Sequence, residues 1–345
     1  MNASKSLVLA AFVSLNLGAC GTGGSPTDPA NFRLVLAANT TPREAFSEII
    51  PLFQLQWLEQ TGQTVAFEES YQGSGAQSRA VVEGFEADIV VLSLEADLAR
   101  VVDSGLITHD WKAVGANGMM SNSVVAFAVR AGNPLGINDW ADLAREDVEV
   151  LTPNPSTSGG AMWNMLALYG AALRGHVDSI PADDPVAAKE FLKLVLRNVT
   201  VMDDSARDSI TNYEQGVGDV ALTYENEVVI GWGAGYDYEL VIPSSTILIE
   251  NPVAVVDEYV DEHGTREVAE AFVEFLFTRE VQEILARHGL RSVNPDVAAS
   301  NSGQYAEVQD LFTIEFFGGW AQAREEIFGE EGIFSTAILE VQGGE

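Results

Sequence analysis

Four short stretches of small and polar residues carry most of the chemistry that this sequence offers, and each stands where a strand-like run gives way to a helical pattern. They cover residues 38–44, 70–78, 152–161 and 203–209. The first N–H groups of a helix have no partner within the helix, and the helix dipole puts positive charge at that end. Glycines beside Ser74 and Ser158 let the backbone turn tightly and leave these amides uncovered. Together the four helix starts would form an anion site that needs no lysine or arginine.

Sites of other kinds find little support in the residue types. None of the four histidines stands in a metal-binding spacing, and Cys20 is the only cysteine. No G-x-S-x-G motif surrounds Ser74, so this serine lacks the usual setting of a nucleophile. We therefore expect no catalytic residue, no metal and no cofactor.

The elements that must position these loops alternate along the chain. Strands are predicted over residues 33–38, 64–69, 87–94, 124–129, 148–151, 200–202, 220–224, 241–249 and 253–256. Helices are predicted over residues 42–60, 77–85, 161–174, 185–196, 266–277, 279–288 and 320–327. Strands that alternate with helices predict α/β units on a largely parallel sheet. The length of 345 residues and the order of the elements indicate two lobes, between which the chain crosses more than once.

The first predicted helix has a specific start signal. Thr41 is expected as its N-cap, Pro42 as its first residue and Glu44 as the side chain that closes a capping box. Such a box satisfies backbone N–H groups at the helix start, so it would fix the loop that precedes the helix.

The charge of the chain excludes further classes of function. Acidic residues number 51 against 18 basic ones, which gives a formal net charge of −33. Nucleic-acid binding needs a basic face, and this charge opposes adhesion to an anionic bilayer. Only 4 of the basic residues are lysines, and acidic, lysine-poor chains are common among proteins that work at high salt. With 47% hydrophobic residues the chain can still bury a core in each lobe.

The first twenty residues have the pattern of an export signal. Lys5 is followed by an apolar run over residues 7–15 and then by the letters LGAC, which end at Cys20. The run is too short to span a bilayer, and small residues precede the expected cleavage site. The placement of Cys20 resembles the lipobox of bacterial lipoproteins, although a plain secretory signal with a chance cysteine is the alternative. We predict a signal peptide over residues 1–19, a lipid on Cys20 and a flexible tether over residues 20–31.

Several blocks of residues resemble the sulfate-binding proteins of ABC importers. The blocks are GSGAQ at 73–77, GNP at 132–134, DW at 139–140, LTPNP at 151–155, TSGGA at 157–161, WN at 163–164, GDV at 218–220, ENE at 225–227, PVAVVD at 252–257 and FGGW at 317–320. They follow the family's order from about residue 32 to about residue 334. The resemblance implies an α/β, two-lobed periplasmic-binding-protein fold of the type II class, in which two chain crossings join the lobes. We expect lobe I to comprise residues 32–120 and 250–345, and lobe II residues 121–249.

The resemblance also implies which residues hold the anion. Ser74 would offer its amide, with its hydroxyl as a further donor, and Ser158 would offer its hydroxyl. Gly159 and Gly160 would each offer an amide, as would Ala206 from the fourth loop.

Two positions depart from the family's pattern. Thr40, with Thr41 beside it, stands where the family often has an aspartate that donates its backbone N–H, so this exchange keeps the donor. Tyr224 stands where well-known members have a tryptophan whose indole N–H points at the anion. A tyrosine hydroxyl can also donate a hydrogen bond, but its reach differs.

A site of this kind would select an anion by its protonation. Sulfate carries no proton at neutral pH, whereas a protonated phosphate would leave a buried O–H facing donors only, at a cost of about 1–3 kcal/mol. Such a site needs no countercharge. Arg207, Arg43 and Gln77 are therefore expected to support the loops from outside rather than to bind the anion directly.

The resemblance implies capture of sulfate, and often of thiosulfate, and delivery to a membrane permease with a cytoplasmic ATPase. We expect an exported monomer in the periplasm or on the outer face of the cytoplasmic membrane, attached to the membrane only through its lipid and without a nucleic-acid partner. Capture of molybdate or tungstate on the same fold is the alternative within the class. An anchored hydrolase of sulfate or phosphate esters and a ligand-dependent sensory protein are alternatives from other classes.

Overall fold

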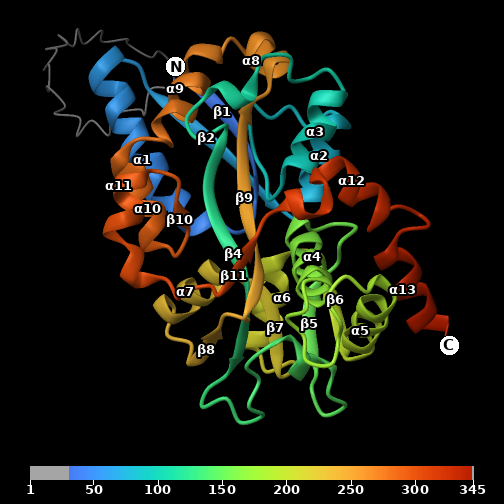
Figure 1. Ribbon diagram of the computed structural model, residues 1–345. Coiled ribbons are helices and arrows are strands. Elements are labelled where there is room, and N and C mark those ends of the chain that lie inside the picture. The colour runs from blue at the N-terminus through green and yellow to red at the C-terminus, as the bar shows by residue number, and fades with distance from the viewer. Residues whose placement is uncertain (1–30, 344–345) are drawn as a thin grey trace, which may run out of the picture.

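The computed structural model describes residues 31–343, which form two lobes joined by long strands (Figure 1). The strands are β1 (Phe32–Asn39), β2 (Val65–Gln72), β3 (Ile89–Val91), β4 (Met119–Arg130), β5 (Val150–Pro153), β6 (Val199–Asp203), β7 (Val220–Tyr224), β8 (Tyr238–Val241), β9 (Ser245–Val255), β10 (Arg291–Ser292) and β11 (Asp310–Phe312). The α-helices are α1 (Arg43–Thr61), α2 (Ser74–Val82), α3 (Glu95–Asp103), α4 (Gly159–Leu173), α5 (Pro185–Arg197), α6 (Ala206–Glu214), α7 (Glu225–Gly233), α8 (Asp257–His263), α9 (Arg266–Phe275), α10 (Arg279–Arg287), α11 (Pro295–Ser300), α12 (Gly319–Glu326) and α13 (Ile333–Gly343). The strand order is β2-β1-β3-β9-β4-β7-β5-β6, with β8, β10 and β11 paired beside this path.

In the first lobe β1 lies between β2 and β3, and these three strands are parallel. Their apolar side chains point to both faces of the sheet. Leu36 packs on one face with Phe46 and Phe272 from α1 and α9, whereas Val90 packs on the other with Leu98 from α3. Because helices cover both faces, the loops that follow the carboxyl ends of these strands are the positions open to a ligand.

The second lobe repeats this arrangement. Strand β5 pairs in parallel with both β6 and β7. Phe127 and Trp163 belong to the core on one side of the sheet, and Ile210 and Tyr213 from α6 belong to the core on the other side. The loops after β5, β6 and β7 therefore leave the sheet at a single edge.

Two strands join the lobes. The first half of β4 pairs with β9, and its second half pairs with β7 in the second lobe. Strand β9 pairs with β4 along its middle, over residues 248–252, and with β3 of the first lobe at its end. These are the two crossings that the resemblance implied, and Figure 1 shows both strands running from the upper lobe to the lower one.

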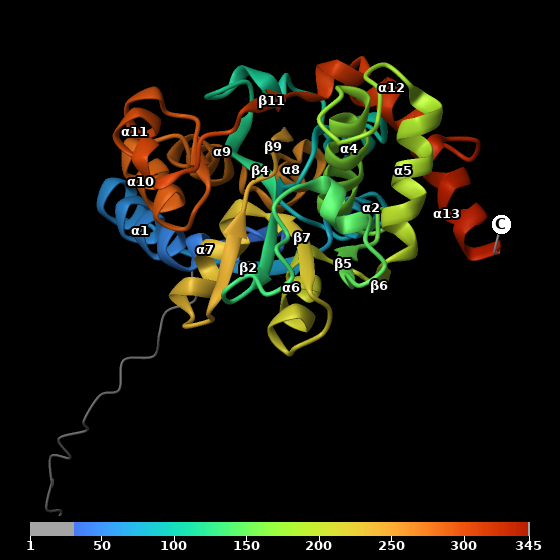
Figure 2. The ribbon, with the colours of Figure 1, turned by 60° about the horizontal axis from the view of Figure 1, so that its bottom comes forward.

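The C-terminal part of the chain passes between the lobes a third time. Strand β11 adds to the first half of β9, and the residues after it pack into the core of the second lobe. Trp320 stands edge-on to Trp163 with ring centres 4.6 Å apart, and α13 lies beside α5 (Figure 2). Residues 250–345 were all expected in lobe I. The cluster that contains Phe312, Phe317 and Phe334 shows that the last part of this range packs with the second lobe instead.

Most predicted elements are present, and the differences lie at boundaries. The strand expected over residues 87–94 is only β3, because α3 begins within one turn of its end. The strands expected over residues 241–249 and 253–256 are largely one long strand, β9. Helices α3, α7, α8, α11 and α13 and strands β8, β10 and β11 were not predicted, and no range was predicted for α6. Within residues 31–343 no helix has both the length and the apolar character needed to cross a bilayer.

Candidate functional site

The loop after β1 contacts the opposite lobe. Thr41 is buried, and its carbonyl oxygen accepts a hydrogen bond of 3.4 Å from the Asn226 side chain of α7. The predicted capping box is wrong, because Pro42 occupies the N-cap without a side-chain bond. The Glu44 carboxylate binds Arg207 of the second lobe instead. The physical reason is that a guanidinium from the facing lobe is a stronger partner than a backbone N–H.

The loop after β2 approaches the second lobe so closely that only glycine fits. A β-carbon on Gly73 would stand 2.6 Å from the Asp204 carbonyl oxygen and 2.7 Å from that of Thr157. Helix α2 begins directly afterwards at Ser74, three residues before the predicted start. The amide of Ala76 donates to the Thr157 carbonyl at 3.0 Å, which joins the second and third loops across the lobes.

The third and fourth loops meet at Gly160. Ser158 caps α4, and its hydroxyl oxygen accepts from the Ala161 amide at 3.4 Å. A β-carbon on Gly160 would lie 3.3 Å from the Ser158 hydroxyl oxygen, 3.3 Å from the Tyr224 ring and 3.5 Å from the β-carbon of Ala206. The structure thus brings Ser158, Gly160, Ala206 and Tyr224 together, as the site prediction requires.

Several backbone amides around these loops donate no hydrogen bond within residues 31–343. Among them are those of Thr40, Thr41, Ser74, Gly75, Gly159, Gly160 and Ala206. Most of them sit at the first positions of α2, α4 and α6, where a helix provides no acceptor. Buried amides without partners are rare in proteins, so this group is suited to a ligand that accepts several hydrogen bonds.

Tyr224 adds a side-chain donor to this group. The residue is buried, and its hydroxyl has no hydrogen-bond partner within the described part of the chain. Burial raises the pKa of Tyr224 well above its ordinary value of 10, so the hydroxyl keeps its proton at neutral pH. A protonated hydroxyl beside the bare amides can donate to an acceptor.

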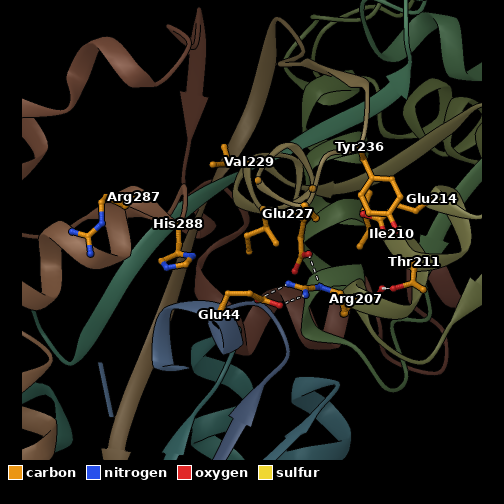
Figure 3. Close-up of a pocket in the computed structure, with 14 residues that line it drawn as sticks. Glu44, Arg207, Ile210, Thr211, Glu214, Glu227, Val229, Tyr236, Arg287 and His288 are labelled. Atoms are coloured by element: carbon orange, nitrogen blue, oxygen red, sulfur yellow. Dashed lines mark hydrogen bonds and ion pairs between the residues drawn. The ribbon is translucent and has the colours of Figure 1, made fainter. Parts of the chain in front are cut away.

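An ion network lies beside the bare amides and crosses between the lobes. Figure 3 shows Arg207 between Glu44 of the first lobe and Glu227 of the second. Glu227 is buried, and burial raises its pKa although the guanidinium opposes this effect. Burial alone would lower the pKa of Arg207, but the charges of Glu227 and Glu44 raise it overall. The arginine is therefore fully charged and neutralised by two carboxylates.

The same network forms the floor of an open groove of about 520 Å³ between the lobes, which is also lined by His288 and Tyr236. Among the residues predicted from sequence to form or support the anion site, only Arg207 lines this groove. The groove thus lies beside the cluster of bare amides and is a separate cavity.

The remaining predicted residues lie in different places. The exposed Arg43 stands over the Tyr71 ring, with 5.2 Å from its guanidinium carbon to the ring centre. Gln77 is buried and donates to the Ser70 carbonyl at 3.2 Å, so it braces the second loop. Cys20, with the predicted signal peptide and most of the tether, lies outside the described residues.

Two neighbours of the site were missed from sequence. Asp97 accepts the hydroxyl hydrogen of Ser74 at 2.7 Å, and the Ser93 amide donates to the Ser74 hydroxyl oxygen at 2.9 Å. The Ser74 hydroxyl is therefore engaged within its own lobe, and only the amide of Ser74 is bare. A small polar residue near the end of a strand is the signal that identified the other loops. Ser93 lies two residues after β3 but inside the longer strand predicted over residues 87–94, and so it was missed.

Comparison with known proteins places this geometry in a family. A family model described as bacterial extracellular solute-binding protein matches residues 34–291. The sulfate-binding protein of Synechocystis sp. is 46% identical over 316 residues, which cover 91% of this chain and 88% of the relative. The sulfate-binding protein of Escherichia coli is 40% identical over 297 residues, covering 85% and 88%. The thiosulfate-binding protein of Pseudomonas aeruginosa is 34% identical over 299 residues, covering 85% and 88%.

A solved structure agrees with these relatives. The sulfate-binding protein SubI from Mycobacterium tuberculosis is 36% identical, with a TM-score of 0.79 over 86% of this chain and 99% of that one. The two lobes and the loops that meet between them therefore define a solute-binding protein of the periplasmic-binding-protein fold. Within this class, the chain belongs to the sulfate-binding protein family.

The buried ion network generates a first prediction. Arg207→Met leaves Glu227 buried without its guanidinium, and we expect the free energy of unfolding to fall by about 3–5 kcal/mol. The pKa of Glu227 in the folded protein lies above its ordinary value of 4.5 and would rise further in the variant. The folded state then binds the proton more tightly than the unfolded state, so the loss of stability should shrink as the pH falls from about 7 to about 5.

Urea unfolding at several pH values measures this effect. Arg207→Lys keeps the charge and should lose less stability. Adding Glu227→Gln to Arg207→Met removes the buried charge and should restore part of the loss. If the loss of unfolding free energy in Arg207→Met is the same at every pH and Glu227→Gln does not relieve it, the role given to Arg207 and Glu227 is refuted.

Proposed function

We propose that this protein captures sulfate between its two lobes and delivers it to an ABC importer made of a membrane permease and a cytoplasmic ATPase. The observation that carries the proposal is the group of unpartnered amides that four strand-to-helix loops bring together from both lobes. The names of the relatives support the choice of anion, and those named as thiosulfate-binding proteins support thiosulfate as a second ligand.

The proposed donors carry no charge. They are the amides of Thr40, Ser74, Gly159, Gly160 and Ala206, with the hydroxyls of Ser158 and Tyr224, and Thr41 lies beside them. About six hydrogen bonds to a charged group, at about 1.5–3 kcal/mol each, amount to roughly 9–18 kcal/mol before costs. Micromolar binding requires about −8 kcal/mol, so the donors leave enough to offset lobe closure and desolvation.

The choice between anions follows from protonation. A fully ionised sulfate accepts every hydrogen bond that such donors offer. A protonated phosphate would turn at least one O–H toward them and lose about 1–3 kcal/mol for the unpaired group. Closure of the lobes is part of the mechanism, because water would otherwise compete for the same donors. The protein itself would bind and release the anion without transforming it.

Calorimetry with sulfate, thiosulfate and phosphate tests this function. Sulfate should bind with micromolar or tighter affinity, and phosphate should bind about 5- to 150-fold more weakly, as the cost of about 1–3 kcal/mol implies. Gly73→Ala should weaken sulfate binding at least about tenfold, because its β-carbon would meet two carbonyl oxygens of the facing lobe and oppose closure. Gly303→Ala, with open space around its β-carbon, is the matched control and should bind normally. Phosphate binding without sulfate binding would overturn the proposal.

Tyr224→Phe tests the hydroxyl of Tyr224, which is buried without a hydrogen-bond partner among the described residues. A lost hydrogen bond to a charged anion should weaken sulfate binding roughly ten- to hundredfold. The anion-free protein should lose no stability, because the hydroxyl has no partner there. Tyr213 is also buried with an unpartnered hydroxyl, but it lies in the core behind α6. Tyr213→Phe should therefore leave the affinity unchanged. Equal effects of the two substitutions would exclude Tyr224 from the site.

We also propose that export and anchoring use the N-terminal residues. The apolar run over residues 7–15 and the position of Cys20 support a lipid on this cysteine after removal of residues 1–19. Expressed in a bacterial host, the protein should appear in the membrane fraction with the mass of a lipidated N-terminus. Cys20→Ser should leave it soluble outside the cytoplasm, and a soluble, lipid-free wild-type protein would refute the anchor.

A further inference from the structure

A buried carboxylate stands against the helix start that we propose to hold the anion. Asp97 lies on α3, and its side chain is only 4% exposed. Its Oδ2 atom is 3.1 Å from the position that a β-carbon on Gly159 would take. A negative charge at this place would repel a bound dianion, because few water molecules remain in the closed interface to screen it. The structure must therefore neutralise or occupy this group.

Both oxygens of Asp97 are occupied by donors from the first lobe. Oδ2 accepts the hydroxyl hydrogen of Ser74 at 2.7 Å, and Oδ1 accepts from the Arg100 guanidinium at 3.0 Å. Arg100 lies one turn further along α3 and also donates to the Ser78 hydroxyl. The Ser74 oxygen in turn accepts from the Ser93 amide at 2.9 Å. Each polar atom in this series of hydrogen bonds, from the Arg100 guanidinium to the Ser74 hydroxyl, thus has a defined role as donor or acceptor.

We propose that Asp97 and Arg100 determine which anion the site accepts. Arg100 cancels the charge of Asp97, and Ser74 occupies the oxygen that faces Gly159, so the wall of the site offers no free acceptor to a protonated anion. Asp97 and Arg100 act through Ser74 and through the local charge, and neither needs to touch the ligand. This inference rests on the proposed function of the site.

The chemistry predicts how selectivity changes when the pair is broken. Without the guanidinium, the Asp97 carboxylate has no countercharge and can turn toward the anion. A fully ionised anion such as sulfate then meets a like charge. A protonated phosphate can instead donate its O–H to the carboxylate, and a hydrogen bond to an ionised acceptor is stronger than one between neutral groups.

Calorimetry with sulfate, selenate, molybdate and phosphate on four proteins tests the inference. In Arg100→Met the affinity for sulfate should fall at least about tenfold, and the sulfate-to-phosphate ratio at least about thirtyfold. Arg100→Lys keeps a positive charge and should retain most of the ratio. The double variant Asp97→Asn/Arg100→Met has no carboxylate, so sulfate binding should recover and any gain for phosphate should disappear.

The outcomes separate this inference from the proposed function. Sulfate binding by the wild-type protein reports on the function, whereas the ratio in the variants reports on Asp97 and Arg100. If the wild-type protein binds selenate or molybdate better than sulfate, the ratio of that anion to phosphate serves instead. If Asp97 and Arg100 had a merely structural role, the variants would bind all the anions more weakly by the same factor and the sulfate-to-phosphate ratio of affinities would stay unchanged. That result would overturn the inference. So would a double variant that stays as defective as Arg100→Met, or a wild-type protein that binds none of the anions.

Discussion

Backbone N–H groups at the start of a helix have no partner in their own helix, and the rest of this structure is arranged around that constraint. The starts of α2, α4 and α6 and the loop before α1 hold such amides where the lobes meet. Glycine is required in these loops because the backbones approach one another directly, as Gly73 does with the facing carbonyl oxygens. The bare amides follow from the helix starts, and the tight contact follows from glycine, which places no side chain between the facing backbones.

The charged side chains beside the bare amides bind one another, so the donors that remain at this place are uncharged N–H and O–H groups. Arg207 lies next to Ala206, yet its guanidinium is held by Glu44 and Glu227. Arg100 is likewise turned toward Asp97 and Ser78. Arg207 and Arg100 are thus both paired with carboxylates of the protein. An anion held by uncharged donors can be released when the lobes open, because water then replaces the same hydrogen bonds.

A chain with a net charge of −33 that binds an anion is not a contradiction. Exposed charges are screened beyond about 8 Å at physiological ionic strength, and more strongly at higher salt. Bare amides at the lobe interface act over hydrogen-bond distances, within which solvent ions cannot screen them. The long-range repulsion therefore affects the rate of encounter with an anion, whereas in the site that we propose the local donors would set the affinity.

The sequence by itself determined the α/β class, most of the longer strands and helices and the four loops that the structure brings together between the lobes. Those features depend on local signals, such as apolar runs, glycine beside serine and a small residue after a strand, and all of them can be seen within a few residues. Only the tertiary structure decided the partners of the charged side chains. Glu44 has the pattern of a local capping residue but binds Arg207, which is distant in sequence. Asp97 likewise becomes part of the site only because the fold brings α3 against Ser74 and Gly159. The free energy of such pairs depends on burial and on neighbours from other elements, and no local pattern records either one.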